Sequence, residues 1–222
     1  MKSIHLIAPS GASLDSKSPL AGISWLESQG IAVENTDCVN RVFERFAGSD
    51  DVRLAEINQI AQLDPKTMVM AMRGGYGLHR LLPGIEWSAI AKAIQNGLQV
   101  CGHSDFTVFQ LGLLAKTGAI TLAGPMLNYD FGRLGDDGTP VVPDAFMWEH
   151  FQNATEGRKL ECVVSAPQAF LGKAKTSSLA GMLWGGNLTV VAGLVGTPYL
   201  PSNKQTQGGI LFLEDVNEHP YR

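Results

Sequence analysis

The sequence predicts an α/β fold, in which a doubly wound, mainly parallel sheet is followed by a smaller β-rich unit. Short apolar runs typical of strands alternate with segments in which apolar residues recur at helical spacing. Such alternation requires crossover connections, which make neighbouring strands parallel and cover both faces of the sheet with helices. The composition, 45% hydrophobic and 17% charged over 222 residues, is that of a globular protein with an ordinary core.

Residues 1–150 are expected to form the doubly wound domain, of flavodoxin-like or Rossmann-like type. We expect its strands at 4–8, 31–33, 67–72, 98–101 and 119–122, and its helices at 20–29, 50–63, 87–95, from about 105 onward, and at 145–153. Gly30 ends the first helix, and the segment Gly48-Ser49-Asp50 supplies an N-cap for the second.

Residues 176–222 are expected to form a partial C-terminal domain, joined by a connecting region at 151–175. Strand-like segments at 178–184 and 209–216 flank a helical segment at 188–194 that Gly185-Gly186-Asn187 introduces. A unit of this size has few residues with which to close a core of its own. We therefore expect that the chain is cut short.

The charge and the absence of long apolar runs exclude several classes of function. The net charge is −4, and Lys and Arg are scattered, which argues against a nucleic-acid surface and against an anionic-membrane anchor. No run approaches the roughly 20 apolar residues of a membrane span, so we expect a cytoplasmic protein. The cysteines, Cys38, Cys101 and Cys162, are odd in number and never in a C-x-x-C pair, so we interpret them as core thiols. No paired His ligands indicate a metal site.

The segment Val100 to Thr107 reads as a strand, a sharp turn and a helix, with Ser104 on the turn. A serine held there projects at the carboxyl end of a strand, in front of free helix N–H groups, which suits a nucleophile. Phe106 stands where the G-x-S-x-G elbow has its second glycine, and an N-cap serine is an equally good interpretation of the pattern alone. His103 is a poor candidate base, because adjacent side chains diverge on a sharp turn.

A glycine-rich loop, Arg73-Gly74-Gly75-Tyr76-Gly77, follows the strand at 67–72. Parallel strands end at the same edge of a sheet, so this loop and the Ser104 turn are expected to meet. Backbone N–H groups of Gly74 or Gly75, with that of Asp105, could then form an oxyanion hole. The alternatives are a phosphate cradle, for which the pattern lacks the usual spacing, and a tight turn that needs glycine.

Glu214 and Asp215 follow the apolar run at 210–213. Such strand-end carboxylates often mark only the point where a strand reaches water. The functional alternative is an acid that orients an imidazole, as in a serine triad.

Taken together, these segments resemble the LD-carboxypeptidases, a family of serine peptidases that includes murein tetrapeptide carboxypeptidases and microcin-immunity hydrolases. The resemblance runs nearly end to end, through Ile7-Ala8-Pro9-Ser10-Gly11, Phe46-Ala47-Gly48-Ser49-Asp50 with Arg53, Arg73 to Gly77, Gly102-His103-Ser104-Asp105, Gly124-Pro125, Gly185-Gly186-Asn187-Leu188, Gly196-Thr197-Pro198-Tyr199 and Leu213-Glu214-Asp215-Val216.

The resemblance implies that Ser104 is the nucleophile, Glu214 the triad acid, and Gly74, Gly75 and Asp105 the oxyanion hole. It also implies substrate contacts from Arg73, Tyr76 and Asn187, no cofactor, and a possible homodimer. The implied substrate is a murein peptide ending in D-alanine, cleaved through an acyl-enzyme during peptidoglycan recycling. The family's catalytic histidine lies downstream of the L-E-D motif, and His219 does not match it, so we expect little activity from the 222 residues alone.

Two alternatives remain open at this stage. A microcin-type hydrolase would cleave an acyl-linked aminoacyl nucleotide analogue with similar groups. A protein that keeps the Ser104 cleft but lacks a base would bind a peptide ending in D-alanine without turning it over.

Overall fold

The structure is a computed structural model that describes residues 2–161 and 178–215, and every structural statement below is limited to these ranges. The predicted connecting region therefore falls largely outside the described residues, as do Cys162 and His219.

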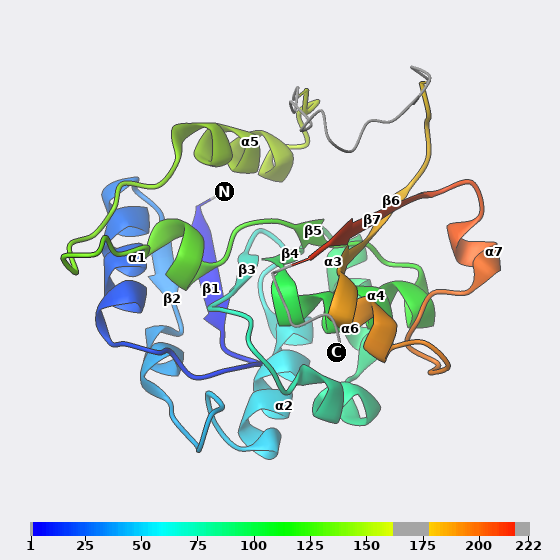
Figure 1. Ribbon diagram of the computed structural model, residues 1–222, viewed down its shortest axis with the longest axis horizontal. Coiled ribbons are helices and arrows are strands. Elements are labelled where there is room, and N and C mark those ends of the chain that lie inside the picture. The colour runs from blue at the N-terminus through cyan, green and yellow to red at the C-terminus, as the bar shows by residue number, and fades with distance from the viewer. Residues whose placement is uncertain (1, 162–177, 216–222) are drawn as a thin grey trace.

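A five-stranded parallel sheet forms the centre of the N-terminal domain (Figure 1). Its strand order is β2-β1-β3-β4-β5, the doubly wound order of flavodoxin-like folds, so the predicted fold class is confirmed. The strands are β1 (Ser3–Ile7), β2 (Ala32–Glu34), β3 (Met68–Ala71), β4 (Gln99–Gly102) and β5 (Leu122–Ala123).

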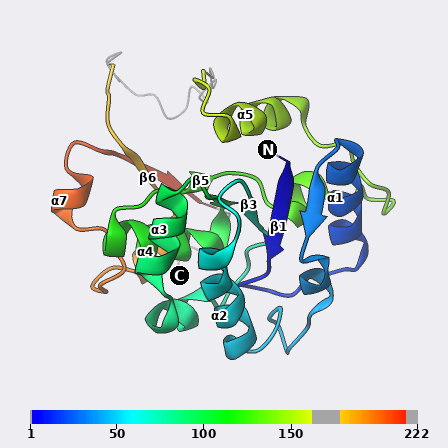
Figure 2. The same cartoon turned by 180° about the vertical axis from the view of Figure 1, so that it is seen from behind.

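Helices cover both faces of this sheet, because successive residues of its buried strands point to opposite sides (Figures 1 and 2). In β3, Met68 and Met70 belong to one core cluster, and Val69 and Ala71 to the other. The first cluster includes residues of α1 (Lys17–Ser28), the π-helix η5 (Leu127–Phe131) and α5 (Ala145–Thr155). The second includes residues of α2 (Asp50–Gln59), η2 (Ile60–Gln62), η3 (Leu78–Gly84), α3 (Trp87–Gln95) and α4 (Thr107–Thr117).

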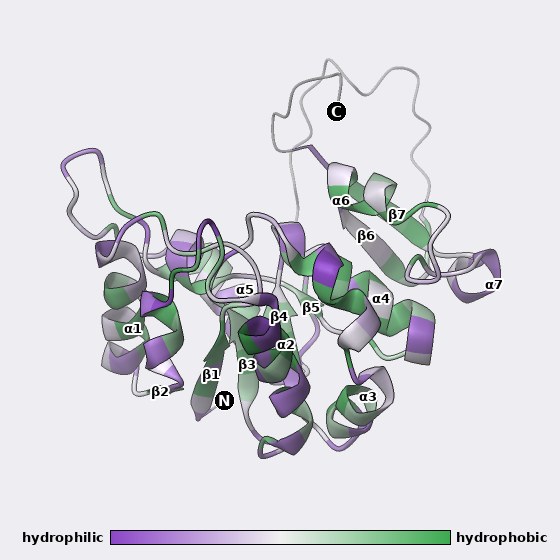
Figure 3. Cartoon of the chain, turned by 90° about the horizontal axis from the view of Figure 1, so that it is seen from below, coloured by the Kyte–Doolittle hydropathy of each residue, from purple (hydrophilic) through white to green (hydrophobic). Residues whose placement is uncertain are grey.

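A smaller C-terminal unit packs against α4 (Figure 3), and its strands also face the end of β5 across a cavity. It contains the parallel strands β6 (Leu183–Asn187) and β7 (Ile210–Glu214) and the helices α6 (Leu188–Gly193) and α7 (Asn203–Thr206). A Cβ on Gly186 would lie 2.7 Å from Thr107 Oγ1, so glycine permits the close approach of β6 to α4. The Gln205 side chain adds a hydrogen bond, donating from Nε2 to the Leu114 carbonyl at 2.9 Å.

The predicted boundaries differ from the structure at several elements. The segment expected to be a strand at 178–184 forms β6 at Leu183–Asn187, so the glycines expected to introduce a helix belong to the strand. A Cβ on Gly185, whose φ is +122°, would lie 2.0 Å from the Phe212 carbonyl oxygen, which explains glycine there. The helix expected at 50–63 is α2, which ends at Gln59 and continues as η2, and the Ser49 cap accepts from Val52 N. Sequence periodicity did not predict η5, α7 or the 3-10 segments η1 (Thr36–Asn40), η3 and η4 (Ser104–Phe106).

Candidate active site

Ser104 lies at the turn between β4 and α4, in the left-handed backbone region. Its φ is +58°, which costs a non-glycine residue on the order of 1–2 kcal/mol and is maintained only where surrounding structure imposes it. Asp105 and Phe106, the other residues of η4, are both buried and anchor the turn. The conformation is that of a strained strand-to-helix elbow that presents a side chain above the sheet edge.

Phe106 explains why this turn lacks the second glycine of a G-x-S-x-G elbow. Its ring is fully buried and lies against the end of β4, since a Cβ on Gly102 would be only 2.6 Å from Phe106 Cδ1. The close approach needed at the elbow therefore occurs at Gly102, between the strand end and the phenyl ring. Ser104 keeps its position without a glycine two residues later.

The glycine-rich loop after β3 lies directly beside the Ser104 turn, because β3 and β4 are adjacent parallel strands. A Cβ on Gly74 would stand 2.7 Å from Ser104 Oγ and 3.1 Å from the Asp105 backbone nitrogen. Gly75 follows with φ of +111°, a conformation that side chains rarely adopt. The loop and the Asp105 backbone nitrogen thus both lie close to the Ser104 hydroxyl.

The Asp105 carboxylate joins three loops at this sheet edge. Its Oδ2 accepts hydrogen bonds from Ser10 Oγ at 2.7 Å and from Leu78 N at 3.2 Å. Burial raises the pKa of the Asp105 carboxyl, an effect that these two hydrogen bonds partly oppose. The sequence indicated only a role for the Asp105 backbone, whereas the structure shows that its side chain fixes the turn to the loops after β1 and β3.

Glu214 approaches the site from the C-terminal unit. It is the last residue of β7 and pairs in register with Asn187, the last residue of β6. Since a Cβ on Gly186 would lie 2.7 Å from Thr107 Oγ1 at the start of α4, this end of the two-stranded sheet adjoins the helix that follows Ser104. The strand pairing therefore brings Glu214 to the same end of α4 as Ser104.

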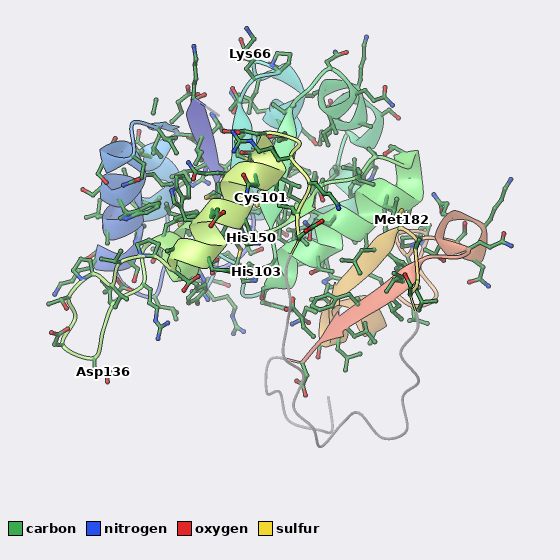
Figure 4. The ribbon with its side chains drawn as sticks, turned by 90° about the horizontal axis from the view of Figure 1, so that it is seen from above. Lys66, Cys101, His103, Asp136, His150 and Met182 are labelled. Carbon is green, nitrogen blue, oxygen red and sulfur yellow. The ribbon has the colours of Figure 1, made fainter. Side chains whose placement is uncertain are left out.

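A cavity of about 300 Å³ lies between α4 and β5 on one side and β6 and β7 on the other. Its lining includes Glu214, Met182 and His103, the residue before Ser104; His103 and Met182 are labelled in Figure 4. The cavity is therefore bordered by Glu214 of the C-terminal unit and by His103, which precedes Ser104 in the turn after β4.

The described histidines make no hydrogen bond to the Ser104 side chain. His103 Nε2 lies 3.1 Å from Asp130 Oδ2, which also accepts from Met126 N at 2.7 Å. Within residues 2–161 and 178–215, no hydrogen bond joins the Ser104 side chain to an imidazole. His219 lies outside the described residues.

The three residues expected to contact substrate have different surroundings. Arg73 is almost buried and donates from Nη1 to the Ala12 carbonyl at 2.8 Å. Tyr76 is exposed, with its ring 5.8 Å from that of Phe46. Asn187 is buried, and its Oδ1 caps α6 by accepting from Val190 N at 3.0 Å, so its side chain has a structural role here.

The sequence assigned no role to two further buried side chains at this sheet edge, Arg53 and Asn128. Arg53 is fully buried and donates to the carbonyls of Pro9, Gly48 and Gly77, which ties together three loops at the sheet edge. Asn128 in η5 donates its backbone N–H to the Met72 carbonyl at 3.0 Å and is also buried. An irregular segment such as η5 has no periodicity from which its contacts could have been predicted.

Other reactive groups are few in the described part of the chain. No group of three or more His, Cys, Asp or Glu side chains in residues 2–161 and 178–215 could hold a metal ion. Cys38 and Cys101 are buried free thiols, and burial raises the pKa of Cys38 to about 12 and that of Cys101 further. Among the described helices, none is both long and apolar enough to cross a membrane.

Comparison with known proteins gives consistent matches along the chain. Residues 4–124 match the model of the LD-carboxypeptidase N-terminal domain, and residues 180–222 match that of the LD-carboxypeptidase C-terminal domain. The chain is 32% identical over 219 residues to a probable murein peptide carboxypeptidase of Bacillus subtilis, covering 99% of this chain and 64% of that protein. It is 26% identical over 214 residues to the Escherichia coli microcin C7 self-immunity protein MccF, covering 87% of this chain and 60% of that protein.

Among solved structures, the crystal structure of muramoyltetrapeptide carboxypeptidase from Oxalobacter formigenes is similar, with 36% identity and a TM-score of 0.74. The match covers 100% of this chain and 68% of that one. The chain therefore spans about two thirds of the length of these relatives.

Proposed function

The chain belongs to the LD-carboxypeptidase family, and from this premise we propose that it carries the nucleophile and the acid of a serine-type LD-carboxypeptidase. The proposed substrate is murein tetrapeptide, and the bond cleaved is the amide between the L-centre of diaminopimelate or lysine and terminal D-alanine. The proposed setting is peptidoglycan recycling in the cytoplasm, by a protein that could act as a homodimer.

The observation that supports this proposal best is the strained position of Ser104. Ser104 has φ of +58° and lies beside a glycine whose absent Cβ would stand 2.7 Å from its Oγ, and this geometry supports the role of nucleophile over that of helix cap. An ordinary N-cap serine has extended backbone angles, and its side-chain oxygen accepts from the second or third helical amide. Ser104 makes no such bond among the described residues.

In the proposed reaction, Ser104 Oγ attacks the scissile carbonyl while a base removes the hydroxyl proton. The amide of Asp105 and one from Gly74 or Gly75 stabilise the negative charge on the carbonyl oxygen. The C–N bond then breaks, D-alanine leaves with its nitrogen protonated by the base, and an acyl-enzyme remains. Water hydrolyses this ester and restores the Ser104 hydroxyl.

The proposal assigns to Glu214 the role of orienting the base as an imidazolium forms. Its support is the position of Glu214 at the end of β7, on the cavity that His103 also lines. His103 itself is bound to Asp130, so the base is assigned to a residue outside the described ranges.

The test is release of D-alanine from murein tetrapeptide by the product of the gene's whole reading frame. Ser104→Ala should lower kcat by roughly 10³- to 10⁶-fold, because an acyl-enzyme can no longer form, while the thermal unfolding midpoint stays within a few degrees of the parent protein. Retained activity in the alanine variant would overturn the assigned nucleophile.

The similarity to MccF supports a second candidate substrate, an aminoacyl nucleotide analogue. One solved structure of MccF is a complex with glutamyl sulfamoyl guanosine, although at 22% identity that likeness concerns the fold alone. Assaying both substrates in parallel distinguishes the candidates. Slow labelling of Ser104 by a fluorophosphonate, with binding but no turnover, would favour a non-catalytic peptide-binding protein.

A further inference from the structure

The cavity between the two units follows one face of α4. The residues of this helix that line it, Thr107, Gln110, Leu111 and Leu114, recur at positions i, i+3, i+4 and i+7, which lie on the same side of a helix. Seven residues at a rise of 1.5 Å span about 10 Å, so the cavity extends about two helical turns along α4. Its volume of about 300 Å³ thus has the elongated form that an extended side chain requires.

One end of this cavity adjoins the candidate nucleophile. His103, directly before Ser104, and Thr107, three residues after it, both line this end. Strand β6 ends here as well, because a Cβ on Gly186 would lie 2.7 Å from Thr107 Oγ1. Leu183, the first residue of β6, therefore lines the opposite end. A peptide whose scissile carbonyl lies at Ser104 thus has the cavity beside the residue that supplies this carbonyl.

The middle of the cavity has apolar walls. Leu111 comes from α4, Leu122 from β5, and Trp184 and Phe212 from the two strands of the C-terminal unit. Such walls bury the methylene groups of a lysine-type side chain, while its charged head remains at a polar group. D-alanine has only a methyl side chain, so the residue before it is the part of the proposed substrate that fits this space.

Gln110 supplies a hydrogen-bond acceptor in the wall of the cavity. Its Nε2 donates to the Gly102 carbonyl at 3.1 Å and to the Leu122 carbonyl at 2.9 Å. Because both amide protons are used, the orientation of the amide is fixed and Oε1 remains as an acceptor. No described residue donates to Oε1, and the side chain is only partly buried. A ligand group that donates hydrogen bonds, such as an ammonium, satisfies this oxygen.

The charged groups around the cavity favour the same kind of ligand. Among the described residues that line it there is no lysine or arginine, and Glu214 contributes a carboxylate. The other titratable residue of the lining is His103, whose Nε2 lies 3.1 Å from Asp130 Oδ2, so that carboxylate offsets any positive charge on the ring. A ligand carboxylate inside the cavity would therefore lose its hydration without a described cation as its partner.

We propose that the cavity along α4 binds the side chain of the residue before D-alanine, that Gln110 Oε1 accepts a hydrogen bond from its ammonium group, and that lysine is preferred to diaminopimelate. The two residues share the same chain up to the carbon that bears the distal amine, and diaminopimelate has an additional carboxylate on that carbon. This inference rests on the proposed function, because it takes the scissile carbonyl to lie at Ser104. It goes further by assigning the group that selects between the two residues.

The experiment compares three tetrapeptides that differ only in the residue before D-alanine. This residue is lysine, diaminopimelate linked through its L-centre, or norleucine, which has the four-carbon chain of lysine without the amine. Release of D-alanine by the product of the whole reading frame gives kcat/KM for each peptide. The value for lysine should exceed that for diaminopimelate by about 10- to 100-fold and that for norleucine by about 10-fold, as expected for an unpaired carboxylate and for a lost hydrogen bond to a charged group.

Leu183→Arg supplies a cation at the end of the cavity away from Ser104. Leu183 is 67% exposed, so the fold should accept the longer side chain. The variant should raise kcat/KM for diaminopimelate relative to lysine by about three- to tenfold. Leu179→Arg is the matched control, because Leu179 is 75% exposed in the same unit and does not line the cavity. It should leave the ratio of the parent protein unchanged.

Gln110→Met removes the acceptor and retains a long side chain. It should lower kcat/KM for the lysine peptide to that for the norleucine peptide and leave the norleucine value within about twofold. Because Gln110 also donates to two carbonyls, a purely structural role would lower both values equally, and that result would contradict its assignment. Circular dichroism checks that each variant is folded.

Equal kcat/KM for the lysine and diaminopimelate peptides would overturn the inference, as would equal values for lysine and norleucine or an unchanged ratio in Leu183→Arg. The proposed function fails separately. If none of the peptides released D-alanine, hydrolysis would be refuted, and calorimetric binding of the same peptides would decide the inference. Tighter binding of the lysine peptide would then retain the assigned cavity, and equal or absent binding would refute it. D-alanine release without a preference for lysine would refute only the assigned cavity.

Discussion

The two sides of the candidate site are held in place to different degrees. On the side of the proposed nucleophile, here called the nucleophile side, Ser104 follows a strand buried on both faces, and the buried Asp105 carboxylate accepts from Ser10 and Leu78. On the side of the proposed acid, here called the acid side, Glu214 ends a two-stranded sheet in which Leu211, Phe212 and Leu213 are each 44–48% exposed. The nucleophile side is thus built from interactions within the sheet edge, whereas the acid side is placed mainly by the contact of β6 with α4.

This difference matches what each side is proposed to do in the reaction. A strained turn such as that of Ser104 requires many fixed partners, since a weakly held turn would relax out of the left-handed region. An acid that only orients another group needs fewer contacts of its own. Changes on the nucleophile side should therefore affect geometry and stability together, and changes at Glu214 should affect the reaction alone.

Glu214→Gln tests the acid side and should have the largest effect of the three substitutions considered next. If Glu214 stabilises an imidazolium, the amide should lower kcat by roughly 10³- to 10⁴-fold with little change in KM or in the thermal midpoint. Steady-state assays of D-alanine release by the whole reading frame measure this effect.

Glu34→Gln is the matched control, because Glu34 also ends a parallel strand but lies on the edge strand β2 and is exposed. It should leave kcat within about twofold, as expected for a surface substitution. An equal loss of kcat in both variants, or a large loss of stability in Glu214→Gln, would remove the distinction drawn between the two sides.

Gly74→Ala tests the nucleophile side at its tightest contact. The new methyl group would lie 2.7 Å from Ser104 Oγ and 3.1 Å from Asp105 N, so the side chain or the loop must move. We expect kcat to fall by about 10²- to 10³-fold, the usual loss when one oxyanion donor is displaced. The measurement is kcat together with the rate of Ser104 labelling by a fluorophosphonate, which should fall as well.

Gly30→Ala is the control for the loss of stability that follows from replacing a glycine anywhere in the backbone. Gly30 has φ of +78° at the end of α1, and a Cβ there would meet nothing within 4 Å. It should lose about 1 kcal/mol of stability without loss of kcat. If a fluorophosphonate labelled Ser104 in the Gly74→Ala variant as fast as in the wild-type protein, the loop would accommodate a side chain and would not form the oxyanion hole.

The sequence predicted a doubly wound parallel sheet because alternating strands and helices leave a strong periodic signal, but it did not separate the flavodoxin-like strand order that the structure shows from the Rossmann-like one. The sharp turn at Ser104 was also recognisable, since glycines and a serine stood where β4 ends. The partners that hold this turn were not predictable. The Asp105 carboxylate reaches Ser10 across 95 positions of sequence, and Asn128 lies in a π-helix without a period. Such contacts depend on how loops fold together, which local patterns do not encode.

Asp105→Asn makes the smallest change to the nucleophile side. Ser10 Oγ and Leu78 N both donate to the same oxygen, Oδ2, so an asparagine carbonyl in that position can accept both hydrogen bonds. Asp105→Ala cannot, and leaves two buried donors unpaired at about 1–3 kcal/mol each. Urea unfolding should therefore show a loss of several kcal/mol for alanine and of less than about 2 kcal/mol for asparagine.

The pH dependence of the asparagine variant separates the charge of Asp105 from its hydrogen bonds. Because burial raises the pKa of this carboxyl in the folded protein, the stability it contributes is complete below the ordinary value of about 3.9 and is lost as pH rises through the raised pKa. Asparagine does not ionise and loses no stability in this way. The unfolding free energy of the variant relative to the parent should therefore increase as pH rises from about 3.9 to above the raised pKa of Asp105. Hydrogen bonds lower the pKa values of Asp15 and Asp137. Both residues are present in the variant and in the parent, so their contributions to the pH dependence of stability cancel in the difference. The nearby charges of Arg53 and His79 act to lower the Asp105 pKa and limit the size of the increase. If the unfolding free energy of the variant relative to the parent instead fell as pH rises, the hydrogen bonds and nearby positive charges would stabilise the ionised carboxylate more than burial destabilises it. The strained turn would then depend on the charge of Asp105 as well as on its two hydrogen bonds.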